Sequence, residues 1–81
     1  MSVTAYVLLE AEPGKVKELV TELAKIKGVD CACGVTGPYD VILYVESKDM
    51  DALGELVTKK IQTLKGVRKT MTCLCTFCSA K

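Results

Sequence analysis

Residues 35–46 of this 81-residue chain read VTGPYDVILYVE and show which class of sheet the chain forms. Gly37 and Pro38 give a turn signal between two runs of strand-forming residues. A short turn can join antiparallel neighbours, whereas a parallel crossover needs about a dozen residues or more. The stretch therefore predicts a β-hairpin and disfavours the alternative, a doubly wound parallel sheet.

The residues on either side of this hairpin repeat one pattern. Strand signals cover residues 3–10, 29–36, 40–46 and 69–77. Apolar residues three and four apart predict amphipathic helices over residues 16–26 and 50–64, and ELVT at 18–21 recurs at 55–58. The order is βαββαβ. Two interlocked βαβ units predict a ferredoxin-like α+β fold, with an antiparallel sheet of order 4-1-3-2 and both helices on one face.

The expected strands are apolar on both of their faces. In the third strand, Val41, Leu43 and Val45 alternate with Ile42 and Tyr44. A sheet with two apolar faces is covered on both sides, and two helices on one side leave the other face open. We expect a second chain to cover that face by sheet-on-sheet packing in a twofold dimer. The alternative is a tighter curl of helices and sheet that hides both faces.

The composition excludes several classes of protein. Hydrophobic residues make up 49% of the chain, which excludes a disordered protein, and the net charge of +1 disfavours a basic nucleic-acid binder. The chain has no His, so the commonest general base and metal ligand is missing. No apolar run reaches the roughly 18–20 residues that span a bilayer. We expect a cytoplasmic protein without enzymatic activity or a cofactor.

The turn of the hairpin combines residue types that suit a small ligand. Gly37 leaves space beside the backbone, Asp40 can accept from an ammonium group, and free turn amides can hold a carboxylate. An amino-acid-like ligand fits that combination. The alternative is that Asp40 only caps the turn.

The turn and the segments around it resemble the Lrp/AsnC ligand-binding domain, also called the RAM domain. The resemblance is strongest in GPYD at residues 37–40 and in GVRKTMT at residues 66–72, and it extends from Ala5 to about Phe77. Family members usually carry an N-terminal helix-turn-helix, for which these 81 residues show no pattern. We therefore expect one RAM domain over residues 1–81, in the stand-alone form.

This resemblance implies a non-catalytic module for transcription regulation. Such domains dimerise through their sheets, often form rings of four dimers, and bind effector amino acids between dimers. The residues that match the effector pocket are Gly37, Pro38, Tyr39, Asp40, Thr70 and Thr72. The chain is expected to bind a small amino acid there and to associate with full-length Lrp/AsnC regulators, without contacting nucleic acid or a membrane itself.

The five cysteines depart from that family pattern. Cys31 and Cys33 lie on the second expected strand, and Cys73, Cys75 and Cys78 lie on or after the fourth. Two thiolates at i and i+2 share a strand face and can share a soft metal, so a metal-binding or redox protein on the same fold is the alternative function. The thiols can otherwise be small buried hydrophobes or pocket lining. Since the two strands are expected at opposite sheet edges, we predict no disulfide from Cys31 or Cys33 to Cys73 or Cys75 within one chain.

Overall fold

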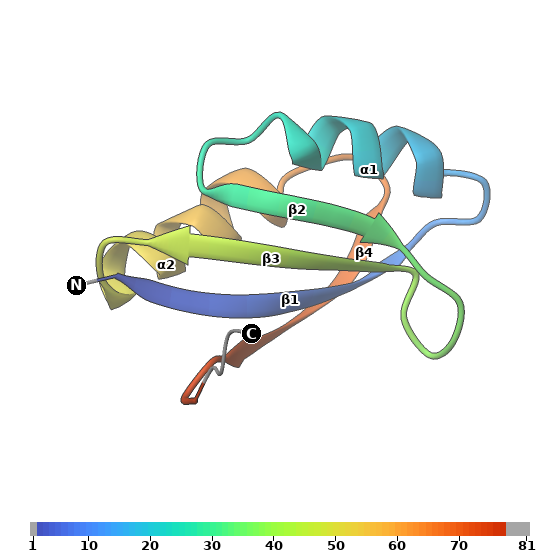
Figure 1. The fold of residues 1–81 in the computed structure, drawn as a ribbon. Helices are drawn as coiled ribbons and strands as arrows, with labels where there is room; N and C mark the ends of the chain where they lie inside the picture. The colour runs from blue at the N-terminus through green and yellow to red at the C-terminus, as the bar shows by residue number, and fades with distance from the viewer. Residues whose placement is uncertain (1, 78–81) are drawn as a thin grey trace.

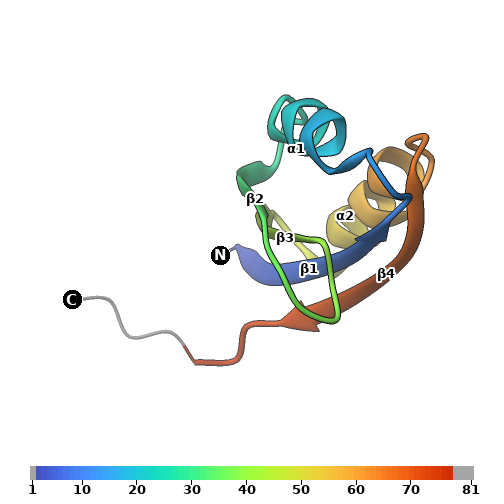
Figure 2. The ribbon, with the colours of Figure 1, turned by 90° about the vertical axis from the view of Figure 1, so that its right-hand side faces the viewer.

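The computed structural model describes residues 2–77, which form a four-stranded antiparallel sheet with helices on one side (Figure 1). The strands are β1 (Val3–Ala11), β2 (Val29–Gly34), β3 (Val41–Ser47) and β4 (Val67–Leu74). The helices are α1 (Val16–Ala24) and α2 (Met50–Glu55), and α2 continues into a π-helical segment, η1 (Leu56–Ile61). The strand order β2-β3-β1-β4 confirms the predicted ferredoxin-like topology. Figure 2 shows α1 and α2 on the same side of the curved sheet, as expected.

The second helical segment departs from the prediction of one regular helix. It begins as expected, because the Asp49 carboxylate accepts a hydrogen bond of 2.8 Å from the Ala52 N–H. It then widens, and the Gln62 N–H donates to the Val57 carbonyl five residues earlier, at 2.9 Å. A π-helical turn is invisible to a search for a 3.6-residue period. No helix within residues 2–77 is long and apolar enough to span a membrane.

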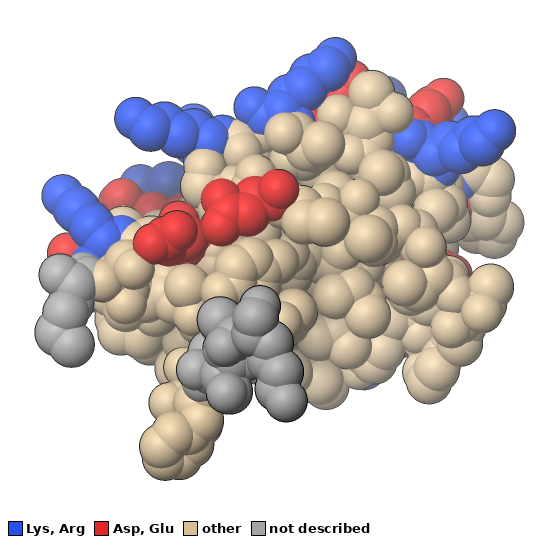
Figure 3. All heavy atoms as spheres, in the orientation of Figure 1, with Lys and Arg blue, Asp and Glu red and all other residues tan. Residues whose placement is uncertain are grey.

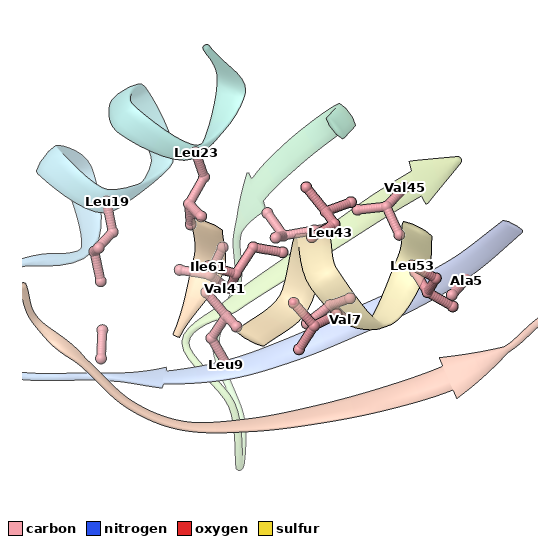
Figure 4. Packing of buried hydrophobic residues seen from close by; sticks show 13 residues of the cluster. Ala5, Val7, Leu9, Leu19, Leu23, Val41, Leu43, Val45, Leu53 and Ile61 are labelled. Carbon is pink, nitrogen blue, oxygen red and sulfur yellow. The ribbon is translucent and has the colours of Figure 1, made fainter. Parts of the chain in front are cut away.

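One face of the sheet packs against the helices. Leu9 of β1 and Leu43 of β3 are fully buried, and so are Leu23 of α1 and Ile61 of η1 (Figure 4). The alternation predicted for the third strand is confirmed, because Val41, Leu43 and Val45 are buried while Ile42 and Tyr44 are not. The buried core consists of Ala5, Val7, Leu9, Ala11, Leu19, Leu23, Val41, Leu43, Val45, Leu53, Leu56, Val57 and Ile61.

The opposite face has no layer over it within residues 2–77, and we call it the uncovered sheet face. By strand register it comprises Tyr6, Leu8, Cys31, Cys33, Ile42, Tyr44, Met71 and Cys73. Tyr6 remains 46% exposed and Met71 45% exposed. Figure 3 shows this side, with most charged side chains in the view along its upper and left parts. The chain's own helices therefore do not hide both faces, and that alternative is wrong.

Candidate functional site

The turn singled out in the sequence lies at the end of the β2–β3 hairpin (Figure 1). The Val35 N–H donates to the Asp40 carbonyl at 2.9 Å and closes the loop. Gly37 has a φ of 134°, a conformation that side-chain-bearing residues rarely adopt, and no atom lies within 4 Å of the position a Cβ would take. Gly37 and Pro38 are both exposed. The space that the sequence predicted beside Gly37 is open.

Asp40 fastens this hairpin to the neighbouring strand. One carboxylate oxygen, Oδ2, accepts a hydrogen bond of 2.8 Å from the Ala11 N–H, and the Asp40 N–H donates to the Leu9 carbonyl at 2.8 Å. The Ala11 N–H is free for this contact because the pairing of β1 with β3 ends at Leu9 and Val41. Asp40 therefore does more than cap its own turn. Its second oxygen, Oδ1, accepts no hydrogen bond from residues 2–77.

Tyr39 and the two threonines lie on opposite sides of the sheet. The Tyr39 hydroxyl donates to Met71 Sδ at 3.5 Å, on the uncovered sheet face. Thr70 and Thr72 pair with the core residues Leu9 and Val7, so they lie on the side of the helices. Within one chain, the sheet itself therefore lies between the Tyr39 hydroxyl and the side chains of the two threonines. A single small ligand can contact Tyr39 and the threonines together only if a second chain contributes some of these residues.

Gln62 is a neighbour of this region that the sequence did not single out. Its side-chain amide donates to Thr70 Oγ1 at 2.8 Å, so the hydroxyl of Thr70 is already oriented. Gln62 lies directly after the last residue of η1. No signal in the sequence gives that position.

An apolar groove lies between the second helical segment and β4. It has a volume of about 330 Å³ and opens beside Gly54, where no atom lies within 4 Å of the position a Cβ would take. Its lining consists of Met50, Leu53, Gly54, Val57, Thr58, Thr72 and Leu74. Thr72 is the predicted site residue that reaches it. In the sequence, the one indication of this groove is Gly54, a glycine within a helical pattern.

The structure separates the cysteines into two groups at opposite sheet edges, as predicted. Cys31 Sγ and Cys33 Sγ on β2 are 3.8 Å apart, and the adjacent Cys33 thiol raises the pKa of the Cys31 thiol through a hydrogen bond and through its charge. Cys75 Sγ donates instead to the Phe77 carbonyl at 3.5 Å, and Cys78 lies outside the described residues. Cys31, Cys33 and Cys73 are exposed free thiols, so the chain's own residues do not bury them as small hydrophobes.

No group of three or more Cys, Asp or Glu side chains within residues 2–77 is arranged to enclose a metal ion. Within the described part of the chain, one copy therefore supplies at most two such side chains to a metal ion. Cys31 and Cys33 on β2 are a pair of thiols close enough to do so.

Comparison with known proteins gives one consistent result. The family model of the Lrp/AsnC ligand binding domain matches residues 4–76. An uncharacterised HTH-type transcriptional regulator of Pyrococcus horikoshii is 36% identical over 74 residues, which are 91% of this chain and 47% of that protein. A solved structure from Thermus thermophilus has a TM-score of 0.90 at 34% identity, covering 98% of this chain and 99% of that chain.

A more distant structure shares the fold alone. A transcriptional regulator of Neisseria meningitidis, solved as a complex with L-Met, has a TM-score of 0.81 at 19% identity, covering 90% of this chain and 49% of that chain. The chain spans about half the length of the curated relatives it matches.

Proposed function

The chain belongs to the Lrp/AsnC ligand-binding domain family, and from this membership we propose that it is a non-catalytic, effector-sensing module of transcription regulation. The observation that carries the proposal is the family match over residues 4–76, which includes both the turn at 37–40 and the strand entry at 66–72. The effector is a small amino acid, bound where two or more chains meet.

The uncovered sheet face supports assembly as the first part of this function. Tyr6 and Tyr44 lie opposite each other on adjacent strands, with ring centroids 5.0 Å apart, in the middle of that face. Aromatic side chains in such positions contribute strongly to protein interfaces. We propose that a second copy packs against this face to form a homodimer, and that dimers associate further, up to a ring of four.

The position of the predicted site residues supports a pocket between such dimers. Gly37 leaves open space at the turn, Asp40 keeps one carboxylate oxygen without a donor among residues 2–77, and Thr72 lies on the other side of the sheet. An amino acid would place its ammonium group against Asp40 and its carboxylate against turn amides or a threonine hydroxyl. The L-Met complex of the fold relative supports amino acids as the ligand class to test first.

The effect on transcription follows from linkage between ligand and assembly. A ligand bound between chains favours the assembly in which its pocket is complete, and that assembly in turn raises the affinity for the ligand. We propose that the partners in this equilibrium include full-length Lrp/AsnC regulators, whose sheets and turns offer equivalent surfaces. In this mechanism the chain itself contacts neither DNA nor a membrane.

Isothermal titration with each of the twenty amino acids tests the effector. We expect at least one amino acid to bind wild type, and Asp40→Asn to weaken that binding about tenfold or more, because a charge-assisted contact is lost. Asp51→Asn is the matched control, since it removes an exposed carboxylate from α2 and leaves the turn intact. Absence of any binding at millimolar concentrations of all twenty would contradict the proposal.

A further inference from the structure

Two thiols lie side by side on the uncovered sheet face at its β2 edge. Cys31 and Cys33 are separated by one residue, so their side chains point to the same side of the strand. Their sulfurs are 3.8 Å apart, and both side chains are exposed. In the strand register, Cys31 lies opposite Tyr44 of β3 and Cys33 lies opposite Ile42. The pair therefore lies at the rim of an apolar surface, open to solvent.

The distance between the sulfurs fits a shared metal ion better than a disulfide. Two thiolates bonded at about 2.3 Å to one tetrahedral Zn²⁺ lie about 3.8 Å apart. A disulfide needs about 2.05 Å between the sulfurs, and residues i and i+2 of a strand are about 6.6–6.8 Å apart at Cα, the upper end of disulfide geometry. The observed separation of 3.8 Å needs little change to accept the metal.

We propose that Cys31 and Cys33 together form a chelating site for a thiophilic d¹⁰ cation such as Zn²⁺. In the binding step two S–H bonds and two bonds from the hydrated Zn²⁺ to water break, two Zn–S bonds form, and two protons and the displaced waters pass to solvent. The pair supplies two of four tetrahedral positions. Solvent or a small anion fills the others in a single chain, and the same pair from a second copy fills them where two β2 edges meet. The site uses none of the residues proposed for the effector.

The second Cys-x-Cys segment shows that spacing alone does not create such a pair. Cys73 lies on β4, but Cys75 follows the end of that strand, and its backbone N–H donates to the Thr4 carbonyl at 3.0 Å. The Cys75 thiol is directed to the Phe77 carbonyl, at 3.5 Å. These cysteines therefore provide a matched control with the same sequence spacing and a different side-chain arrangement.

The test is a Zn²⁺ titration of reduced, metal-free protein in competition with a chromogenic chelator. The control variant replaces Cys73, Cys75 and Cys78 by Ser and keeps the proposed site. We expect it to bind Zn²⁺ with the wild-type affinity, at one ion per chain or one per two chains. We expect Cys31→Ser or Cys33→Ser to lower the affinity at least about tenfold, because loss of a ligand should cost no less than loss of an outer-shell partner.

Substitution with Co²⁺ identifies the ligands directly. Thiolate-to-cobalt charge-transfer absorption is expected in the triple Ser control and is expected to disappear when Cys31 and Cys33 are both Ser. Unfolding by urea checks that each variant folds, and the exposed side chains of Cys31, Cys33 and Cys73 tolerate the change. The proposal is overturned if the control binds no more Zn²⁺ than a variant without thiols, or if the Cys31→Ser/Cys33→Ser variant retains the wild-type affinity.

Discussion

Asp40 combines a structural contact with the capacity for ligand binding. Oδ2 holds the Ala11 N–H at 2.8 Å, where β1 leaves its regular register with β4. Oδ1 has no donor within residues 2–77, so a ligand ammonium group can approach it without breaking the first contact. An alanine at this position removes both functions together. An asparagine keeps an oxygen for Ala11 and removes the charge, which separates the two roles.

The first prediction concerns this structural contact. Asp40→Ala should lower the free energy of unfolding by about 1–3 kcal/mol, because the N–H of the buried residue Ala11 loses its acceptor. Asp40→Asn should lower it less, since the amide oxygen can accept the same hydrogen bond. Urea denaturation followed by circular dichroism measures both values. If Asp40→Ala proves as stable as wild type, the Asp40–Ala11 contact does not support the fold.

The second prediction concerns the reactivity of Cys31. Cys33 raises the pKa of the Cys31 thiol through a hydrogen bond and through its charge, so a smaller fraction of Cys31 is thiolate at pH 8. Cys33→Ala removes both causes, and Cys31 should then be alkylated faster by iodoacetamide. Mass spectrometry of the modified peptides, with a chelator present, measures the rate, and Cys73 serves as the internal control. An unchanged or slower rate at Cys31 would exclude the coupling.

At the scale of elements, glycines of the two helical segments lie in different settings, one after a helix and one within it. After α1, Gly28 has a φ of 101°, and a Cβ there would lie 3.3 Å from the Glu46 carbonyl oxygen, so the turn into β2 depends on glycine. In α2, Gly54 faces open space with an ordinary helical backbone. The first glycine is required by the turn, whereas the second leaves the groove beside β4 open.

The third prediction uses this contrast. Gly28→Ala should lower the free energy of unfolding by about 1 kcal/mol or more, because alanine is strained at that φ and crowds the Glu46 backbone. Gly54→Ala should raise it by about 0.5–1 kcal/mol, the gain in helix propensity. Urea unfolding of both variants provides the comparison. Equal and small effects at the two positions would mean that the turn after α1 adapts to a side chain.

The elements that sequence patterns predicted are those governed by local rules. The alternation of Val41, Leu43 and Val45 with Ile42 and Tyr44 gave both faces of β3 correctly, because side chains alternate along any strand. The contact of Asp40 with Ala11 could not be predicted, since it depends on where the pairing of two strands that are distant in the sequence ends. The π-helical turn of η1 could not be predicted either, because the apolar residues there still recur at the spacing of an α-helix.

At the scale of the whole molecule, the uncovered sheet face explains why so short a chain is 49% hydrophobic. The helices cover one side, and the residues of the other side, such as Tyr6 and Met71, remain about half exposed. Contiguous apolar surface of this kind marks an interaction site more often than it marks a free surface. The face is therefore the natural place for assembly, and the turn at 37–40 lies at its end.

The fourth prediction tests this face. Tyr44→Glu should raise the dimer dissociation constant at least about tenfold, because a charge would be buried without a partner in the middle of the proposed interface. Thr21→Glu is the control, since Thr21 is exposed on α1, on the side of the helices. Size-exclusion chromatography with light scattering measures the mass of each. A wild-type mass retained in Tyr44→Glu would place the interface elsewhere.

Sedimentation velocity of the wild-type chain, with and without the amino acid identified by titration, tests most directly whether this is an effector-sensing subunit. We predict a mass that is an even multiple of the chain mass, and a shift of the distribution between assemblies when the amino acid is added. A single-chain mass at all protein concentrations, unchanged by any amino acid, would contradict both the assembly and its regulation.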